Sequence, residues 1–394
     1  CLLKNYLLCP HTINIKHKIR TKMSKDLKIT PISEWGWNFQ TPLIMTGPCS
    51  VESEEQVRET AKQLSNHRFD ILRGGIWKPR TRPNSFEGIG SIGLKWLKDA
   101  GNEIGKPVAT EVANVKHVYE ALRMGIDVLW IGARTTVNPF AVQEICDALQ
   151  GVDIPVLVKN PINPDLELWI GAFERLNRSG ITKLAAIHRG FSTHEKSKYR
   201  NIPRWNIPIE LKRRYPQLPI VCDPSHICGT REYLREVAQT ALDIGFEGLH
   251  LESHINPDKA LSDAKQQITP EAFGEMMLQL HTRESIEHNP VAENQLEILR
   301  GKIDNLDNYL LEMMSERMDI VREIAEYKRE NNLAIVQPSR WTEILENRLE
   351  TGKRKQLTEK FIKELFHAMH KESIHHQTEV MLLNGENSEV EKKS

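Results

Sequence analysis

Net charge, long apolar runs and a regular cysteine spacing are all missing from this sequence. Lys and Arg together number 53, and so do Asp and Glu, so no overall field would draw the protein to nucleic acid or to an anionic membrane. No apolar run approaches the roughly 18 to 20 residues that span a bilayer, and the six cysteines have no framework spacing. These absences favour a soluble enzyme in a reducing, cytoplasmic compartment.

The first 22 residues differ from the rest of the sequence. They begin with Cys1 rather than Met, and their short apolar stretches lack the ordered regions of a signal peptide. Met23 begins a segment that reads like an ordinary start. We therefore expect residues 1–22 to be a non-native or misassigned extension, and we leave them out of the fold prediction.

Short apolar strands alternate with amphipathic helical stretches between residues 42 and 283. This alternation predicts βα units around a parallel sheet, and eight units in about 240 residues favour a (β/α)₈ TIM barrel in an α/β chain. A doubly wound sheet is the alternative. The expected strands are Leu43–Thr46, Phe69–Leu72, Val108–Thr110, Val128–Ile131, Val156–Val158, Lys183–Ala185, Ile220–Val221 and Gly248–Leu251.

Polar and charged residues follow these strands directly. In a (β/α)₈ barrel the carboxyl ends of all strands meet at one face, where the active site lies. We therefore expect these side chains to converge there. They are Cys49, Lys78, Arg134, Lys159, Arg189, His226 and Glu252.

Basic residues are concentrated in the loop LRGGIWKPRTRPNSFEG, which supplies Arg73, Lys78 and Arg80. Arginine binds phosphate bidentately, and the glycines expose backbone amides, so this composition suits phosphate esters. One basic loop alone is more often a solvated surface. Four basic loops at one face, however, predict a site for two anionic groups.

Four further residues could hold a metal ion: Cys49, His226, Glu252 and Asp263. A mixed set of sulfur, nitrogen and oxygen ligands suits Mn²⁺, Zn²⁺, Fe²⁺ or Co²⁺ better than Mg²⁺ or Ca²⁺. Their spacing is weak evidence, because a lone cysteine or histidine is usually structural.

The motifs GPCSVES, LRGGIWKPRT, IGART, HRGF, CDPSH, HLESH and ALSDAKQ, in this order, closely resemble 3-deoxy-D-arabino-heptulosonate 7-phosphate (DAHP) synthase. The resemblance covers residues 40 to 283 and implies a metal-dependent condensation of phosphoenolpyruvate with erythrose 4-phosphate. It implies that Cys49, His226, Glu252 and Asp263 bind the metal, and that Arg80 and Thr81 of KPRT bind the aldose phosphate. The sister enzyme that makes 3-deoxy-D-manno-octulosonate 8-phosphate carries a KANRS-type loop instead. The residues implied for phosphoenolpyruvate are Arg73, Lys78, Arg134, Lys159 and Arg189.

A helical region follows the barrel. We expect a linker at 284–294, a helical domain at 295–382 and a disordered tail at 383–394. Apolar residues from Leu296 to Tyr327 recur every three or four positions, which predicts one long helix with a packed seam. Arg317 interrupts that seam, and a buried arginine needs an anionic partner.

The segments LRGKIDNLDNYLLEMMSERMDIVREIAEYK, SRW and KESIHHQ resemble the all-helical chorismate mutase. The resemblance implies a three-helix domain that dimerises, rearranges chorismate to prephenate and needs no cofactor. Arg300 lies about 42 Å along the helix from Lys328, so it would have to act in the partner chain. Trp341 replaces the glutamate usual at its position, and we expect weaker mutase activity as a result. The implied site residues are Arg300, Arg317, Lys328, Gln337, Arg340, Ser373 and Gln377.

The sequence therefore predicts a bifunctional enzyme of aromatic amino acid biosynthesis that forms at least a homodimer. In one alternative, the helical domain is mainly a regulatory and dimerising module that binds chorismate or prephenate and controls the barrel. In another, it is only a structural dimer seam. Feedback is a natural role because chorismate lies downstream of the product of the barrel, but coupling requires two states that the ligand distinguishes.

Overall fold

The computed structural model describes residues 27–78, 86–193, 197–283, 290–336 and 338–382. The chain divides into two compact units, Cys1–Glu284 and Ser285–Ser394, and each is described here by itself. No helix within the described ranges is both long and apolar enough to cross a membrane.

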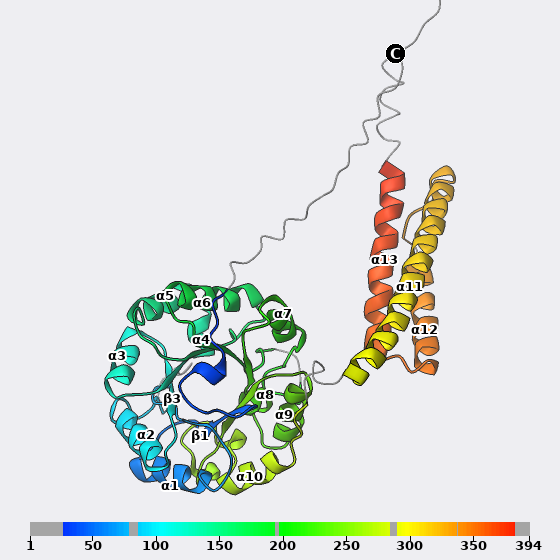
Figure 1. The fold of residues 1–394 in the computed structure, drawn as a ribbon. Helices are drawn as coiled ribbons and strands as arrows, with labels where there is room; N and C mark the ends of the chain where they lie inside the picture. The colour runs from blue at the N-terminus through cyan, green and yellow to red at the C-terminus, as the bar shows by residue number, and fades with distance from the viewer. Residues whose placement is uncertain (1–26, 79–85, 194–196, 284–289, 337, 383–394) are drawn as a thin grey trace, which may run out of the picture. The chain divides into compact units, whose positions relative to one another are not determined.

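The first unit is a closed barrel of eight parallel strands in chain order (Figure 1). The last strand pairs with the first, with Leu43 opposite Gly248 and Gly47 opposite Glu252, and this pairing closes the sheet. The expected (β/α)₈ barrel is therefore confirmed. The strands are β1 (Leu43–Gly47), β2 (Ile71–Arg73), β3 (Val108–Val112), β4 (Val128–Ile131), β5 (Val156–Lys159), β6 (Leu184–His188), β7 (Ile220–Cys222) and β8 (Gly248–Glu252).

Helices form a ring outside the strands (Figure 1). Several begin at a polar residue whose side chain accepts a hydrogen bond from the first turn, as Ser53, Asn114 and Asp165 do. The helices of this unit are α1 (Glu54–Leu64), α2 (Ile92–Glu103), α3 (Val115–Arg123), α4 (Ala133–Thr136), α5 (Pro139–Ala148), α6 (Leu166–Arg178), α7 (Asn206–Arg214), α8 (Pro224–Cys228), α9 (Leu234–Asp243) and α10 (Pro270–Leu278). Short 3₁₀ turns are η1 (Ile32–Glu34), η2 (Pro257–Lys259) and η3 (Ala264–Gln266).

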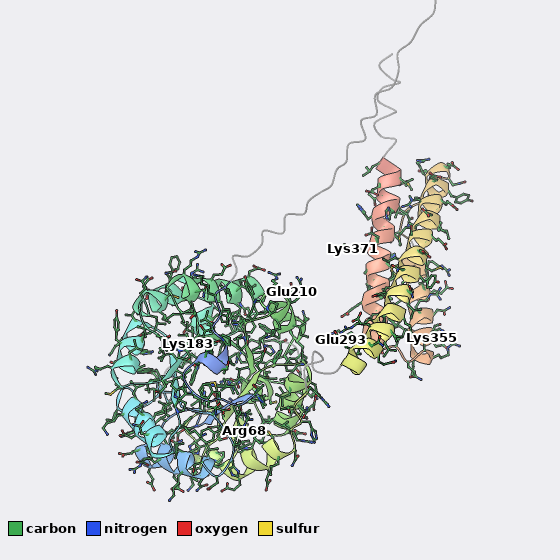
Figure 2. The ribbon with its side chains drawn as sticks, in the orientation of Figure 1. Arg68, Lys183, Glu210, Glu293, Lys355 and Lys371 are labelled. Carbon is green, nitrogen blue, oxygen red and sulfur yellow. The ribbon has the colours of Figure 1, made fainter. Side chains whose placement is uncertain are left out.

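The barrel interior is a packed layer rather than a channel. Side chains fill the space inside the ring of strands (Figure 2). Trp35, which follows η1, is only 1% exposed and packs in one apolar cluster with Met45, Ile71 and Trp130. The indole N–H of Trp35 donates to the carbonyl of Thr30. The segment before β1 thus covers one end of the barrel, which leaves the other end for chemistry.

One buried histidine should make folding of the barrel sensitive to acid. His188 is fully buried beside the rings of Trp205 and Phe191, and burial lowers its pKa to about 3. In the unfolded chain, His188 has an ordinary pKa near 6.5. Below that pH the unfolded chain therefore binds a proton at His188, and the folded chain does not. The free energy of unfolding is therefore not reduced by this group above pH about 6.5, and it should fall by about 2 kcal/mol between pH 6.5 and 5.

The variant His188→Phe should lose this part of the acid sensitivity. The unfolding midpoint in urea, measured at pH 7 and at pH 5, should fall less for the variant than for the natural chain. Equal shifts in both proteins would contradict the assignment.

Over its described residues, the second unit contains three helices: α11 (Pro290–Glu330), α12 (Pro338–Arg354) and α13 (Glu359–Leu382). Its α11 begins inside the 284–294 segment that was expected to be a linker. Val321 and Ala325 of α11 and Ile362 of α13 are the buried apolar residues among those described in this unit. A side chain on Gly352 would come within 2.5 Å of Ile362, so a larger residue there would displace Ile362 where α12 meets α13.

The prediction of a packed apolar seam along α11 is wrong within one chain. Leu310, Met313, Ile320 and Tyr327 are each more than half exposed. Successive residues of a helix point about 100° apart, and α11 turns the neighbouring stripe that contains Val321 and Ala325 inward. The small side chain of Ala325 allows the helices to pack closely, while the apolar residues of the expected seam remain exposed.

Candidate functional site

The predicted polar residues of the barrel lie at the carboxyl ends of its strands. Arg73, Lys159 and Glu252 are the last residues of β2, β5 and β8. Cys49 and Arg189 follow β1 and β6, and His226 lies in α8, directly after β7. The fold thus brings these side chains to one face, as expected of a TIM barrel.

The four predicted metal ligands form two close pairs. The sulfur of Cys49 lies 3.6 Å from Oδ2 of Asp263, and Nδ1 of His226 lies 3.8 Å from Oε1 of Glu252. Over the described ranges, no group of three or more His, Cys, Asp or Glu side chains is placed to hold a metal ion together. The pairs are nevertheless linked, because Gln266 bonds to Glu252 at 2.7 Å and Arg200 bonds to both Gln266 and Asp263.

The pKa values of Cys49, Glu252 and Asp263 are shifted in different directions. Burial, followed by the charge of Glu252, raises the pKa of Cys49 to about 12, so it is a neutral thiol at pH 7. Burial would also raise the pKa of Glu252 and of Asp263. The charges of His226 and Arg73 nevertheless outweigh burial at Glu252 and lower its pKa. The charges of His226 and Arg200 likewise lower the pKa of Asp263. Two carboxylates are thus ready for a cation, whereas Cys49 is not poised to act as a nucleophile.

The chemistry of this donor set fits a transition-metal ion. A metal about 2.3 Å from sulfur and 2.1 Å from oxygen, in tetrahedral geometry, separates the two ligand atoms by about 3.6 Å. This equals the separation of Cys49 and Asp263. Sulfur, imidazole and carboxylate together suit Mn²⁺, Zn²⁺, Fe²⁺ or Co²⁺.

Buried cations surround these ligands. Arg73 is 1% and Lys159 is 3% exposed, and they lie 5.0 and 5.7 Å from the ring centroid of Trp130. Burial lowers the pKa of Arg189 to about 10, Asp223 opposes this shift, and Arg200 and Arg134 add to it. Arg73 and Lys159 are each paired with one buried carboxylate, Glu252 and Asp223, whereas Arg189 bonds to Asn201. A cluster of buried cations of this kind favours an anionic ligand.

Sequence reasoning missed Asp223, the central carboxylate of the site. One oxygen of Asp223 lies 2.9 Å from Nζ of Lys159, 2.9 Å from Nδ1 of His226 and 3.3 Å from Nδ1 of His250. The signal was present in CDPSH, where an aspartate three residues before a histidine caps a helix, and Asp223 caps α8. Asn201 was missed too, and it accepts a 3.0 Å bond from Arg189 and donates a 2.7 Å bond to the carbonyl of His226.

Lys78 differs in its contacts from the other predicted cations. Its ammonium donates 2.6 Å to the carbonyl and 3.0 Å to the sulfur of Cys49. It therefore lies against the expected metal ligands. Arg80 and Thr81 lie outside the described residues, and Arg134 is exposed at the start of α4.

In the helical unit the structure brings four predicted residues together as two pairs. Arg317 donates 2.7 Å to the hydroxyl of Ser373, and Lys328 donates 3.1 Å to the side-chain carbonyl of Gln377. Both pairs join α11 to α13. Lys328 also donates 2.6 Å to the carbonyl of Ile335.

Two predicted arginines lie apart from these pairs. Arg300 forms an ion pair with Glu297 on the exposed side of α11, and Arg340 lies 2.8 Å from Glu343 and is exposed. Gln337 lies outside the described residues. Trp341 stacks on His370, with ring centroids 4.0 Å apart.

The expected anionic partner of Arg317 is absent from the described part of the chain, where no carboxylate lies within 4 Å of it. Arg317 is only partly buried, so water reaches its guanidinium. The prediction that a buried Arg317 needs an anionic partner in the protein was therefore wrong. Burial, followed by the charge of Arg348, lowers the pKa of Arg317. An added carboxylate would relieve both effects.

Comparison with known proteins gives matches for both units. Residues 36–286 match the family described as "DAHP synthetase I family", and residues 299–378 match "Chorismate mutase type II". A phospho-2-dehydro-3-deoxyheptonate aldolase of Thermotoga maritima is 35% identical over 237 residues, which are 60% of this chain and 68% of that protein. A 2-dehydro-3-deoxyphosphooctonate aldolase of Vesicomyosocius okutanii is 26% identical over 273 residues, 62% of this chain and 91% of that protein.

Solved structures agree with these matches. The crystal structure of a phospho-2-dehydro-3-deoxyheptonate aldolase (DAHP synthase) from Thermotoga maritima aligns with a TM-score of 0.55 and 35% identity. The alignment covers 60% of this chain and 67% of that one.

Proposed function

This chain belongs to the DAHP synthetase I family and carries a chorismate mutase type II domain, and from this premise we propose that its barrel condenses phosphoenolpyruvate with erythrose 4-phosphate. The chain is thus a bifunctional shikimate-pathway enzyme. One observation carries the proposal for the barrel: buried Arg73, Lys159 and Arg189 lie at the strand ends beside the pairs Cys49–Asp263 and His226–Glu252.

Each group of residues has a distinct task. Arg73, Lys78, Arg134, Lys159 and Arg189 bind the phosphate and carboxylate of phosphoenolpyruvate, and Arg80 and Thr81 bind the phosphate of the aldose. Cys49, His226, Glu252 and Asp263 hold one divalent ion, which supplies Lewis-acid polarisation of the aldehyde oxygen. Asp223 fixes the ammonium of Lys159 and the ring of His226 in one network.

The reaction needs charge neutralisation more than a nucleophile. C3 of phosphoenolpyruvate attacks the aldehyde carbon, water adds at C2, and phosphate leaves with cleavage of its C–O bond. Two phosphates and a carboxylate repel one another as the substrates approach, and the fixed cations offset that repulsion. Cys49 would be occupied as a ligand of the ion, and the reaction needs no covalent enzyme intermediate.

Substrate choice provides the test of this proposal. With phosphoenolpyruvate present, erythrose 4-phosphate should give DAHP, and arabinose 5-phosphate should react at least about 100-fold more slowly in kcat/KM, since KPRT should favour the shorter aldose. Loss of phosphoenolpyruvate, followed by its absorbance, measures both reactions. Equal rates would support the octulosonate reaction and contradict the assignment of Arg80 and Thr81.

For the helical unit we infer that Arg317, Lys328, Ser373 and Gln377 form the mutase site. Arg317 binds a carboxylate of chorismate, and Lys328 with Gln377 donates to the ether oxygen, where negative charge grows as the C–O bond breaks. The rearrangement needs a compact conformer and electrostatic complementarity, with no acid, base or metal. Trp341 offers no carboxylate to the substrate hydroxyl, and we expect lower mutase efficiency than in a stand-alone enzyme.

We also infer that two chains share each mutase site. The exposed seam on α11, with Leu310, Met313 and Ile320, offers an apolar surface for a second copy. Arg300 lies on α11 about 42 Å from Lys328 in a straight helix, so it reaches a site only in the partner chain.

Complementation between two inactive variants tests this sharing. Arg300→Ala and Arg317→Ala should each have little mutase activity as pure proteins. After dissociation and reassembly of an equal mixture, half of the dimers are mixed and each has one intact site, so roughly a quarter of the activity should return. No recovery, with mixed dimers verified by mass spectrometry, would contradict a shared site.

A further inference from the structure

We propose that Gln266 is a positioning residue of the metal centre, which holds Glu252 directly and Asp263 through Arg200. The proposal rests on the proposed function, because it takes those two carboxylates as metal ligands. Gln266 itself touches neither the substrates nor the ion in this view. It acts on the ligands before the ion arrives.

Both polar ends of the Gln266 side chain contact charged groups. Its amide nitrogen donates a 2.7 Å hydrogen bond to Oε2 of Glu252, and its carbonyl oxygen accepts a 2.9 Å bond from Nη1 of Arg200. The residue is 1% exposed, so water does not compete for these bonds. Hydrogen bonds to charged groups are stronger than neutral ones and define orientation.

Arg200 extends the arrangement to the second carboxylate. The same Nη1 lies 3.0 Å from Oδ1 of Asp263, and Oδ2 of Asp263 lies 3.6 Å from the sulfur of Cys49. Each carboxylate therefore has one oxygen occupied by this network. The other oxygen faces a second predicted ligand, Cys49 for Asp263 and His226 for Glu252, and that oxygen of Glu252 also accepts a 3.3 Å bond from Arg73.

Two backbone features accommodate this network. Asp263 has a φ of 45°, which side-chain-bearing residues rarely adopt, and strain of this kind persists only where the surroundings enforce it. A side chain at position 229 would come within 2.6 Å of Cβ of Arg200, so the glycine at this position leaves room for Arg200. The loops are thus built around the Arg200 side chain.

Only an amide satisfies both neighbours of residue 266. A glutamate could accept from Arg200, but it would place a second carboxylate at hydrogen-bond distance from Glu252. A methionine would fill the space and bond to neither. By contrast, the side chain of the adjacent Gln267 bonds to main-chain groups, the amide of Cys49 and the carbonyl of Ser262.

Loss of a group that orients metal ligands typically lowers metal affinity 10- to 100-fold. We expect Gln266→Met and Gln266→Glu in the full-length protein to weaken Co²⁺ binding by roughly that factor. Titration with Co²⁺ alone, followed by the absorption of the cobalt–thiolate bond, reports both affinity and coordination. Chorismate mutase activity of the same samples checks that the chain is intact.

The matched control is Gln56→Met. Gln56 is also a largely buried glutamine of the barrel, and its side chain accepts from the main-chain amide of Glu52 near Cys49. This variant should bind Co²⁺ like the natural chain. The Gln266 variants should also change the shape of the cobalt spectrum, which general loosening of the barrel would not do selectively.

Other outcomes would overturn the proposal. Unchanged affinity and spectrum in both Gln266 variants would remove the role of Gln266 while leaving the metal centre intact. An equal loss in Gln56→Met would show that any buried glutamine in this region matters equally. Absence of Co²⁺ binding in the natural chain would instead refute the metal centre of the proposed function.

Discussion

Removing divalent ions with EDTA should abolish DAHP formation and leave the conversion of chorismate to prephenate unchanged. The barrel places a thiol, an imidazole and two ionised carboxylates at its mouth, and loss of an ion that polarises the aldehyde should cost on the order of 10³-fold in rate or more. The proposed mutase site of the helical unit, Arg317, Lys328, Ser373 and Gln377, would act through charge and hydrogen bonds without a metal. Both activities are measured on one preparation.

Adding metal ions back distinguishes removal of the metal by EDTA from inactivation of the protein, because only the first is reversed. Mn²⁺, Zn²⁺, Fe²⁺ or Co²⁺ should restore DAHP formation, and Mg²⁺ or Ca²⁺ should restore little, since a cysteine ligand suits the softer ions. The matched variant Cys49→Ser should need a higher concentration of ion. A synthase that keeps full activity in EDTA, with no metal detected by elemental analysis, would contradict the four-ligand site.

Replacing Arg317 by alanine should remove most mutase activity and leave the synthase active. Arg317 is partly buried, donates to Ser373 and has no carboxylate within 4 Å in the described part of the chain, so a substrate carboxylate is its natural partner. Loss of one such charged contact typically costs about 10² to 10³-fold in kcat. Prephenate formation measures the loss.

The matched control is Arg322→Ala, on the same helix. Arg322 pairs with Asp319 one turn away and should be dispensable. Inhibition of DAHP formation by chorismate or prephenate, measured on the same proteins, distinguishes the two readings of the helical unit. Inhibition that disappears only in Arg317→Ala would support a regulatory role at this site, and normal mutase activity in that variant would contradict a catalytic one.

The sequence predicted the parts of the molecule that repeat or alternate. Eight strand segments were located to within a few residues, because buried parallel strands are short apolar runs between helical stretches. The mouth residues followed from topology, since the strand ends of a barrel must meet. Lys159 and Glu252 were therefore found without any knowledge of their contacts, whereas Arg73 came from the basic loop and the family resemblance.

Side-chain partnerships were not predictable in the same way. Asp223 and Gln266 hold their neighbours through bonds between different segments of the chain, such as the bond between Asp223 and Lys159, which are 64 positions apart. Spacing carries no information about such pairs. The inward stripe of α11 was also misplaced, because the periodicity of apolar residues reflects every surface that a helix covers, including one that a second chain would cover.

The end of the barrel that Trp35 covers is closed, and this restricts the order in which substrates can bind. Trp35 and Trp130 occupy the interior beneath the strand ends, so substrates and products pass through the single mouth. Arg73 and Lys159 are the deepest cations there, whereas Arg134 is exposed. A molecule bound at the deep cations is covered by whatever binds above it. If phosphoenolpyruvate binds these deep cations, as proposed, it should enter first, and an excess of the aldose phosphate should trap the empty enzyme as a dead-end complex, visible as substrate inhibition that phosphoenolpyruvate relieves.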